Sequence, residues 1–410
     1  MSSDNRFARV IFNSKFDPLE WRMNEALGPG FASDGSANFA ALAAVPFAMA
    51  SGQDIHIQGR VCPILLGHLE RFISNRVSFH HPDFKQIRIT ADEKDPVQRC
   101  DPLKPHVLAF SGNLASNYCV VKSLSDTDTR MVRPIGASVT IEGLGDNINP
   151  LPNFDAAFAN ATRIGRRDGF DSYGISTNIL QLANDSWGSP TLSPSTNAYP
   201  LFVAASLNLF SENFGGGILP ADFGYKEETG ILAIASTSPI HPLLSSSGFP
   251  LHGIGSDADQ SQRVSALWEK GRLSDVIFCT RPKNKDTNCG TCPNCRQAIV
   301  MLISRGIGPS DYFAVIPDRT ELIKPLDDDC RSLSISKSIL RHWTSVHDSD
   351  LQFKLWEVMS RQSNQFIAED MEPIGSVNQR EVEKDPSANQ VRSSILKRVS
   401  RSLTNVFGKL

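Results

Sequence analysis

Two patterns of hydrophobic and polar positions alternate along most of this chain. Short apolar runs typical of strands are followed by stretches in which apolar residues recur every three or four positions, as on one face of a helix. The predicted strands lie at 54–59, 84–92, 106–110, 137–143, 173–179, 215–221 and 275–279. The predicted helices lie at 61–73, 116–124, 154–167, 199–210, 261–270 and 296–306. This alternation predicts an α/β fold with a doubly wound, mainly parallel sheet.

Changes in this pattern divide the chain. The segment DPLKP at 101–105 closes the first unit, and the polar stretch before the C-terminus is typical of a linker. The last residues place apolar side chains three and four positions apart, which predicts a basic amphipathic helix. The predicted division is an N-terminal α+β unit (1–104), an α/β domain (105–306), a helical C-terminal extension (307–362), a linker (363–390) and the basic helix (391–410).

Composition and charge narrow the class of protein. The longest apolar run, Phe39–Ala50, is interrupted by Pro46 and is too short to span a bilayer, and the first residues show no signal peptide. We therefore expect a cytoplasmic globular protein without a membrane contact. The net charge of −3 argues against nucleic acid as a partner. Residues 387–410 carry five basic residues and no acidic one, which suits either a docking element for a partner protein or a solvated helix face.

Four of the eight cysteines form a cluster with metal-ligand spacing. Gly290 and Pro293 favour the tight turns that would bring the cysteine thiolates to one point. Four thiolates around zinc make a closed, structural site. The predicted zinc ligands follow the pattern Cys279-x9-Cys289-x2-Cys292-x2-Cys295.

Two alternatives to zinc remain for this cluster. An iron–sulfur cluster also uses C-x2-C-x2-C runs, although its fourth cysteine usually follows closely instead of lying upstream. The other alternative is four unliganded thiols. The remaining cysteines are scattered along the sequence and are expected to be inert thiols: Cys62, Cys100, Cys119 and Cys330.

The loop FSGNLASN at 110–117 follows the first strand of the predicted sheet. Ser111 and Ser116 carry hydroxyl donors, Gly112 allows a close backbone approach, and Asn113 tolerates a left-handed conformation. At the carboxyl end of a parallel strand, such a loop suits a phosphate held at a helix N-terminus. Helix capping alone would explain the same composition.

The SG-x-x-x-S loop together with the later cysteine cluster resembles the PP-loop ATP-pyrophosphatase superfamily, in its 7-cyano-7-deazaguanine synthase (QueC) branch. The resemblance covers about residues 105 to 306. It implies an adenine nucleotide α-hydrolase-like fold, ATP and magnesium used to adenylate a carboxylate, pyrophosphate held by the serine-rich loop, and a structural zinc. Relatives of this branch occur in queuosine synthesis and in bacterial antiviral defence.

This sequence departs from the family loop SGGxDS at two positions. Asn113 replaces the second glycine and Ala115 replaces the acidic residue, so an oxygen ligand for magnesium is lost. Our hypothesis is that Asp222 or Asp146 supplies the missing carboxylate, the alternative being that both are solvated loop acids. Other strand-end residues that could face the same crevice are Glu142, Thr177 and Asn178.

Further candidates are basic residues and histidines. His241, Arg263 and Lys270 precede the cysteine cluster, where a cation could meet phosphate; the alternative is a satisfied surface histidine and ordinary helix charges. His80 and His81 have no partner at ligand spacing and are expected to be structural. The leading hypothesis is a QueC-like protein that adenylates a deazapurine-type or partner-bound carboxylate. The alternative is a catalytically degenerate, zinc-stabilised scaffold for a partner protein.

Overall fold

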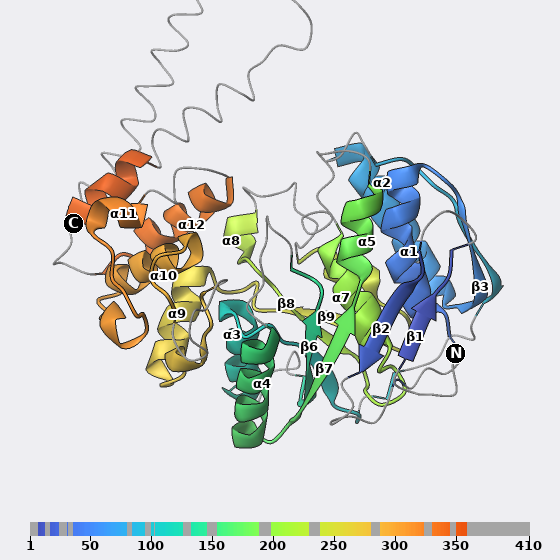
Figure 1. The fold of residues 1–410 in the computed structure, drawn as a ribbon, viewed down its shortest axis with the longest axis horizontal. Helices are drawn as coiled ribbons and strands as arrows, with labels where there is room; N and C mark the ends of the chain where they lie inside the picture. Colours follow the sequence, from blue (N-terminus) through green and yellow to red (C-terminus); the bar gives the residue numbers. More distant parts are fainter. Residues whose placement is uncertain are drawn as a thin grey trace, which may run out of the picture. The chain divides into compact units, whose positions relative to one another are not determined.

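The computed structural model describes most of the chain before residue 359. The described residues are 7–12, 17–23, 31, 36–79, 84–94, 100–101, 103–125, 133–145, 154–187, 198–228, 238–279, 288–323, 330–344 and 350–358. In this part of the chain seven strands form one sheet (Figure 1). Their order is β1 (Phe7–Val10), β2 (Leu19–Met23), β7 (Asp171–Thr177), β6 (Ile135–Glu142), β5 (His106–Ala109), β8 (Gly217–Pro220) and β9 (Leu251–Ile254).

The five strands from β5 to β9 are parallel, which confirms the expected α/β class and mainly parallel sheet. The chain leaves central β5 toward β6 and β7, then returns to build β8 and β9 on its other side. The strand order therefore reverses at β5 and β8. In open α/β sheets, a crevice for ligands lies outside the carboxyl ends of the strands at such a reversal.

Helices cover both faces of the parallel strands (Figure 1). Side chains alternate along β5, so Val107 packs into the core on the α7 side while Leu108 packs with Cys119 and Ile164 on the α3 and α4 side. The helices of this layer arrangement are α1 (Asn38–Ser51), α2 (Pro63–Phe79), α3 (Leu114–Ser125), α4 (Phe154–Asp168), α5 (Ile179–Ser186) and α7 (Tyr199–Asn208).

The first hundred residues contribute to two sheets. β1 and β2 were not expected; they pair antiparallel, and β2 pairs antiparallel with β7 at the edge of the large sheet. The indole nitrogen of Trp21 on β2 donates to Ser206 of α7, over 3.0 Å. A separate two-stranded parallel sheet joins β3 (Ile55–Val61) to β4 (Ile89–Lys94). The boundary expected near residue 104 thus falls inside one compact unit, Met1–Met359.

A second group of helices follows β9 and shares its own hydrophobic core. Its longer elements are α9 (Gln260–Glu269), α10 (Pro293–Ser304), α11 (Arg319–Ile323), α12 (Cys330–Arg341) and a helix over 350–358. The remaining short helices that the structure describes are α8 (Tyr225–Glu228), η1 (His241–Leu244), η2 (Leu273–Asp275) and η3 (Pro309–Asp311). The linker and basic helix expected at 363–390 and 391–410 lie outside the described residues. None of the described helices combines the length and apolar character that a membrane crossing requires.

The prediction of a strand at 275–279 is wrong. This segment starts in η2 and continues without a ladder partner among the described strands, while β9 forms the sheet edge instead. Ile277 donates its backbone N–H to the carbonyl of Gly112, over 2.8 Å, so the apolar run packs beside the loop after β5. Apolar periodicity predicted burial correctly but could not distinguish a strand from a buried extended segment.

A buried carboxylate, that of Asp275, ties α4 to η2 through three arginines. Asp275 is only 2% exposed and accepts from Arg163, Arg167 and Arg272 at 2.8, 2.6 and 2.8 Å. Burial alone would raise the pKa of Asp275, but the arginine hydrogen bonds outweigh burial and lower the pKa below its ordinary value of 3.8. Asp275 therefore stabilises the fold fully above that ordinary pKa, and this contribution is lost as the pH falls toward the lower pKa of the folded state.

We expect Asp275→Asn to destabilise the protein by about 3 kcal/mol near pH 7, because three arginines lose their buried carboxylate. The free energy of unfolding, measured in denaturant from pH 7 to pH 3, should separate the variant from the wild type at neutral pH. The separation should shrink below about pH 4, as the carboxyl protonates in the wild type. Asp185→Asn, an exposed control on α5, should leave the curve unchanged; equal curves for Asp275→Asn would contradict the prediction.

Candidate metal centre and ligand pocket

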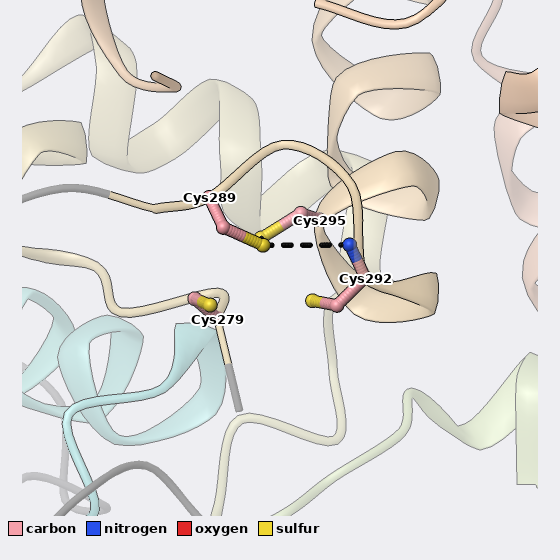
Figure 2. Close-up of side chains that lie close together, drawn as sticks. All are labelled: Cys279, Cys289, Cys292 and Cys295. Atoms are coloured by element: carbon pink, nitrogen blue, oxygen red, sulfur yellow. Dashed lines mark hydrogen bonds between the residues drawn. The ribbon is translucent and has the colours of Figure 1, made fainter. Parts of the chain in front are cut away.

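The structure brings the four clustered cysteines together (Figure 2). Cys279 follows η2, Cys289 and Cys292 flank the turn before α10, and Cys295 lies in the first turn of that helix. Their sulfur atoms all lie within 4.8 Å of one another, and the sulfurs of Cys289 and Cys295 are 3.8 Å apart. In a tetrahedral site with Zn–S bonds of about 2.3 Å, sulfur atoms lie about 3.8 Å apart. The four cysteines can hold a metal ion such as zinc.

The turn between Cys289 and Cys292 is built around the cysteine sulfur. The backbone nitrogens of Thr291 and Cys292 both lie 3.4 Å from the Cys289 sulfur, and Figure 2 shows the contact from Cys292. Burial alone would raise the pKa of Cys289, but these donors and the Thr291 hydroxyl lower it. Gly290 has φ of 80°, and a Cβ there would meet the carbonyl of Val315, so only glycine allows this turn.

Asn288 fixes the backbone around the metal centre, a role that the sequence did not predict. Its side-chain oxygen accepts from the backbone of Phe278 and Cys279, at 2.7 and 3.0 Å. Its amide group donates to the carbonyls of Val276 and Tyr312. One side chain thereby fixes the position of Cys279 relative to the CxxCxxC segment. Only its place directly before Cys289 hinted at this role.

A bound metal ion would change the ionisation of these thiols. The neighbouring Cys292 and burial raise the pKa of Cys295, so this thiol resists ionising unless a cation balances the charge. A bound divalent metal supplies that balance and keeps its thiols deprotonated. The charge of Arg296 is engaged by Glu321 at 3.3 Å.

A cavity of about 270 Å³ lies at the carboxyl ends of β5, β6 and β8, where the strand order reverses. We call it the strand-tip pocket. Apolar strand residues, Phe154 of α4 and Tyr199 of α7 form much of its wall. Its polar lining consists of Ser111, Asn113, Thr140, Glu142, Asp222 and His241.

The loop after β5 contributes to this pocket only in part. Ser111 and Asn113 line it, and Gly112 adopts the left-handed conformation, with φ of 77°. The side-chain oxygen of Asn113 accepts from the N–H of Ser116 over 2.9 Å and so caps α3. Ser116 is 1% exposed, and its hydroxyl donates to the Asn113 carbonyl instead of to the pocket. Helix capping, the alternative to phosphate binding for this loop, therefore describes Asn113 and Ser116.

Two of the proposed carboxylates, Asp222 and Glu142, line the strand-tip pocket. Thr177 and Asn178 do not line it. The Thr177 hydroxyl accepts from the N–H of Ile179, and Asn178 bonds the backbone of β2 and the residue before it. The candidate Asp146 lies outside the described residues, as do His80 and His81.

Arg263, for which the sequence left open a cation for phosphate or an ordinary helix charge, is a buried residue that bonds the backbone. It is 1% exposed and donates to four backbone carbonyls, those of Ala221, Asp222, Gly255 and Ala258, at 2.7 to 3.0 Å. These carbonyls follow β8 and β9, so the guanidinium holds two strand ends to α9. Lys270 is exposed at the end of α9 and does not line the pocket.

His241 and Thr140 line the pocket, and each also has a buried polar atom without a hydrogen-bond partner. His241 is 1% exposed, and Nδ1 of its ring is buried without a hydrogen-bond partner; the same holds for Oγ1 of Thr140. Burial lowers the pKa of His241 to about 4, so the ring is neutral at pH 7. Burial and the nearby Asp222 raise the pKa of Tyr199. The roles of Thr140 and Tyr199 carried no sequence signal.

The geometry thus provides a metal centre made of four thiols and a separate pocket with polar and aromatic walls. Comparison of this chain with models of protein families, with curated proteins and with solved structures gives no match.

Proposed function

We propose that this chain is a degenerate, QueC-like relative of the PP-loop ATP pyrophosphatases that binds a nucleoside-type ligand in the strand-tip pocket without cleaving ATP. The observation that carries this proposal is the position of Ser111 and Asn113, which follow the central strand and border a pocket at the reversal of strand order. Ligands of open α/β sheets bind at this place. Phe154, Tyr199 and Asp222 line the same pocket and add aromatic and polar groups that a nucleoside could contact.

Loss of ATP cleavage follows from two residues of the loop. Asn113 uses its own side chain to satisfy the N–H of Ser116 at the start of α3, and that N–H is therefore not offered to a phosphate. Ala115, which stands where the family has an acid, is 5% exposed and has no oxygen ligand for magnesium. Both changes weaken the electrostatic stabilisation of a leaving pyrophosphate.

The proposed role of the metal centre is structural, with zinc as the ion. Four sulfur ligands leave no open position for a substrate. Cys279 and Cys295 are fully buried in the core shared by α9, α10 and α12, so the ion would hold this group of helices together.

ATP-dependent adenylation of a carboxylate is the second candidate, and the placement of Asp222 favours it. Its carboxylate and that of Glu142 line the pocket that Ser111 also borders. Carboxylate oxygens suit magnesium, which would neutralise phosphate charge when bound there. In this case Asp222 takes over the task of the missing loop acid.

A pyrophosphate-release assay separates the two candidates. The metal-loaded full chain, incubated with ATP, magnesium and a deazapurine carboxylic acid, should release no pyrophosphate above the background of a heat-denatured sample. Ligand-induced thermal shifts with adenosine and with AMP should nonetheless raise the unfolding temperature, since a ligand that binds only the folded state stabilises it. Sustained pyrophosphate release, abolished in Asp222→Asn, would instead establish adenylation.

Replacing Asn113 tests whether the loop borders the ligand. We expect Asn113→Gly to bind magnesium-ATP about tenfold more tightly than the wild type, because the Ser116 N–H becomes available for a charge-assisted hydrogen bond. The glycine costs the helix cap only a few tenths of a kcal/mol. Asn113→Asp keeps the cap but adds a negative charge, so it should bind ATP more weakly than the wild type. Isothermal calorimetry measures all three; equal affinities would show that the loop does not contact phosphate.

A further inference from the structure

The electrostatic character of the strand-tip pocket restricts its ligand. Its described lining contains the carboxylates of Asp222 and Glu142, and no lysine or arginine occurs among the described residues that line it. Arg263, one of the candidate cations for phosphate, donates its hydrogen bonds to backbone carbonyls. A ligand carrying several negative charges would therefore meet like charges in this pocket.

The anion-binding capacity of the nearest helix is also reduced. The N-terminus of α3 is the element that would offer N–H groups to a phosphate, and Asn113 caps it from within the pocket wall. Among the described residues of the lining, both common means of holding phosphate are therefore missing, a basic side chain and an uncapped helix start.

The remaining groups suit an uncharged, hydrogen-bonding ring. His241, Thr140 and Tyr199 line the pocket, and the His241 ring is neutral because burial lowers its pKa to about 4. The walls add an aromatic surface: the rings of Phe154 and Phe158 are stacked 5.8 Å apart with an interplanar angle of 3°, and Phe154 faces the pocket. Planar heterocycles pack on such rings, while carboxylates accept hydrogen bonds from ring or amino N–H groups.

We infer that the natural ligand of the strand-tip pocket is a phosphate-free nucleoside, neutral or cationic, whose N–H groups face Asp222 and Glu142. This inference rests on the proposed function and names the ligand class of the same site. This ligand class would distinguish the protein from α/β proteins in which the phosphate of a nucleotide supplies most of the binding free energy.

A series of ligands that differ only in phosphate number tests the inference. Calorimetry on the full, metal-loaded chain would compare adenosine, AMP, ADP and ATP, first in low salt with EDTA at a level that leaves the metal bound and then with magnesium. We expect affinity to fall with each phosphate, so that adenosine binds at least about tenfold more tightly than ATP. Raising the salt concentration should narrow this difference, because screening weakens the repulsion.

Three outcomes are distinct. A preference for adenosine supports the inference. Tighter binding of ATP overturns the inference while leaving nucleotide binding, and thus the proposed function, in place. Absence of binding by all four ligands, with no thermal shift, overturns both.

Two carboxylate variants attribute the selectivity to the pocket. Glu142→Gln, at an exposed strand end, and Asp222→Asn should each raise the affinity for ATP relative to adenosine by about threefold to tenfold. Glu142→Gln keeps the test decisive if Asp222→Asn does not fold. Glu269→Gln is the matched control, since it removes the same charge from an exposed position on α9 outside the pocket. An equal gain in ATP affinity for Glu269→Gln would overturn the inference.

Discussion

Replacing Cys295 by serine is expected to abolish metal binding and to destabilise the protein by at least about 5 kcal/mol. The reason is that metal binding to a structural four-thiolate site contributes its free energy directly to folding. Cys295 is fully buried on α10, close to the segment that carries Cys279. Its replacement leaves only three thiols for the metal and changes the packing of the core. We expect the helices around α10 to lose their packing first, because the site joins them to the segment after η2.

Elemental analysis of the purified protein measures the metal directly, with about one zinc ion per wild-type chain and none in Cys295→Ser. Denaturant unfolding measures the loss of stability. Cys100→Ser serves as control, since Cys100 lies outside the cluster and should retain both zinc and stability. Iron with acid-labile sulfide would show that the iron–sulfur alternative holds, and a metal-free wild type of full stability would exclude a structural metal.

The second large effect is expected at Arg263. Arg263→Met keeps the approximate volume of the side chain but leaves four buried carbonyls without donors, so we expect a loss of about 3–5 kcal/mol. Arg263→Lys should lose nearly as much, because a compact ammonium group cannot reproduce the planar fork that reaches Ala221 and Gly255 together. Guanidinium unfolding of the three proteins gives these differences.

The control for Arg263 is Lys270→Met, which removes the same charge at the exposed end of α9. Its effect should stay within about 0.5 kcal/mol. A second measurement uses the hydrogen bond between Arg263 and the backbone of Asp222, a residue that lines the pocket. Since the guanidinium holds the carbonyl of Asp222, over 2.9 Å, adenosine binding should weaken in Arg263→Lys even where the variant is still folded. If Arg263→Met were as stable as Lys270→Met, the structural role of the guanidinium would be refuted.

The elements that the sequence predicted well are those whose pattern is local. The helix at 154–167 and the strand at 137–143 correspond to α4 and β6 within two residues. Short edge strands behave differently. β1, β2 and β9 have four, five and four residues, too few to establish a period. β2 joins the sheet through β7, which lies far away in the chain. Pairing, not propensity, made them strands.

The candidate sites divide in the same way. The spacing of Cys289, Cys292 and Cys295 brings three thiols together through one turn and the start of one helix, so the chain sequence suffices. Ser111 and Asp222 were predicted from the rule that strand ends share one edge of a sheet. Whether Arg263 would face a phosphate or the backbone was not predictable, because a helical position does not reveal which carbonyls the side chain reaches.

The sequence by itself determined the α/β alternation, the cysteine cluster and the loop after the central strand, since each depends on residues close together in the chain. The tertiary structure alone decided that Asn113 turns its side chain to the helix, that Thr140 and His241 keep unpaired atoms, and that carboxylates line the pocket without a basic residue among its described neighbours. The pocket joins strand ends more than a hundred residues apart. Its charge and hydrogen bonding arise from burial and side-chain direction, which only long-range packing fixes.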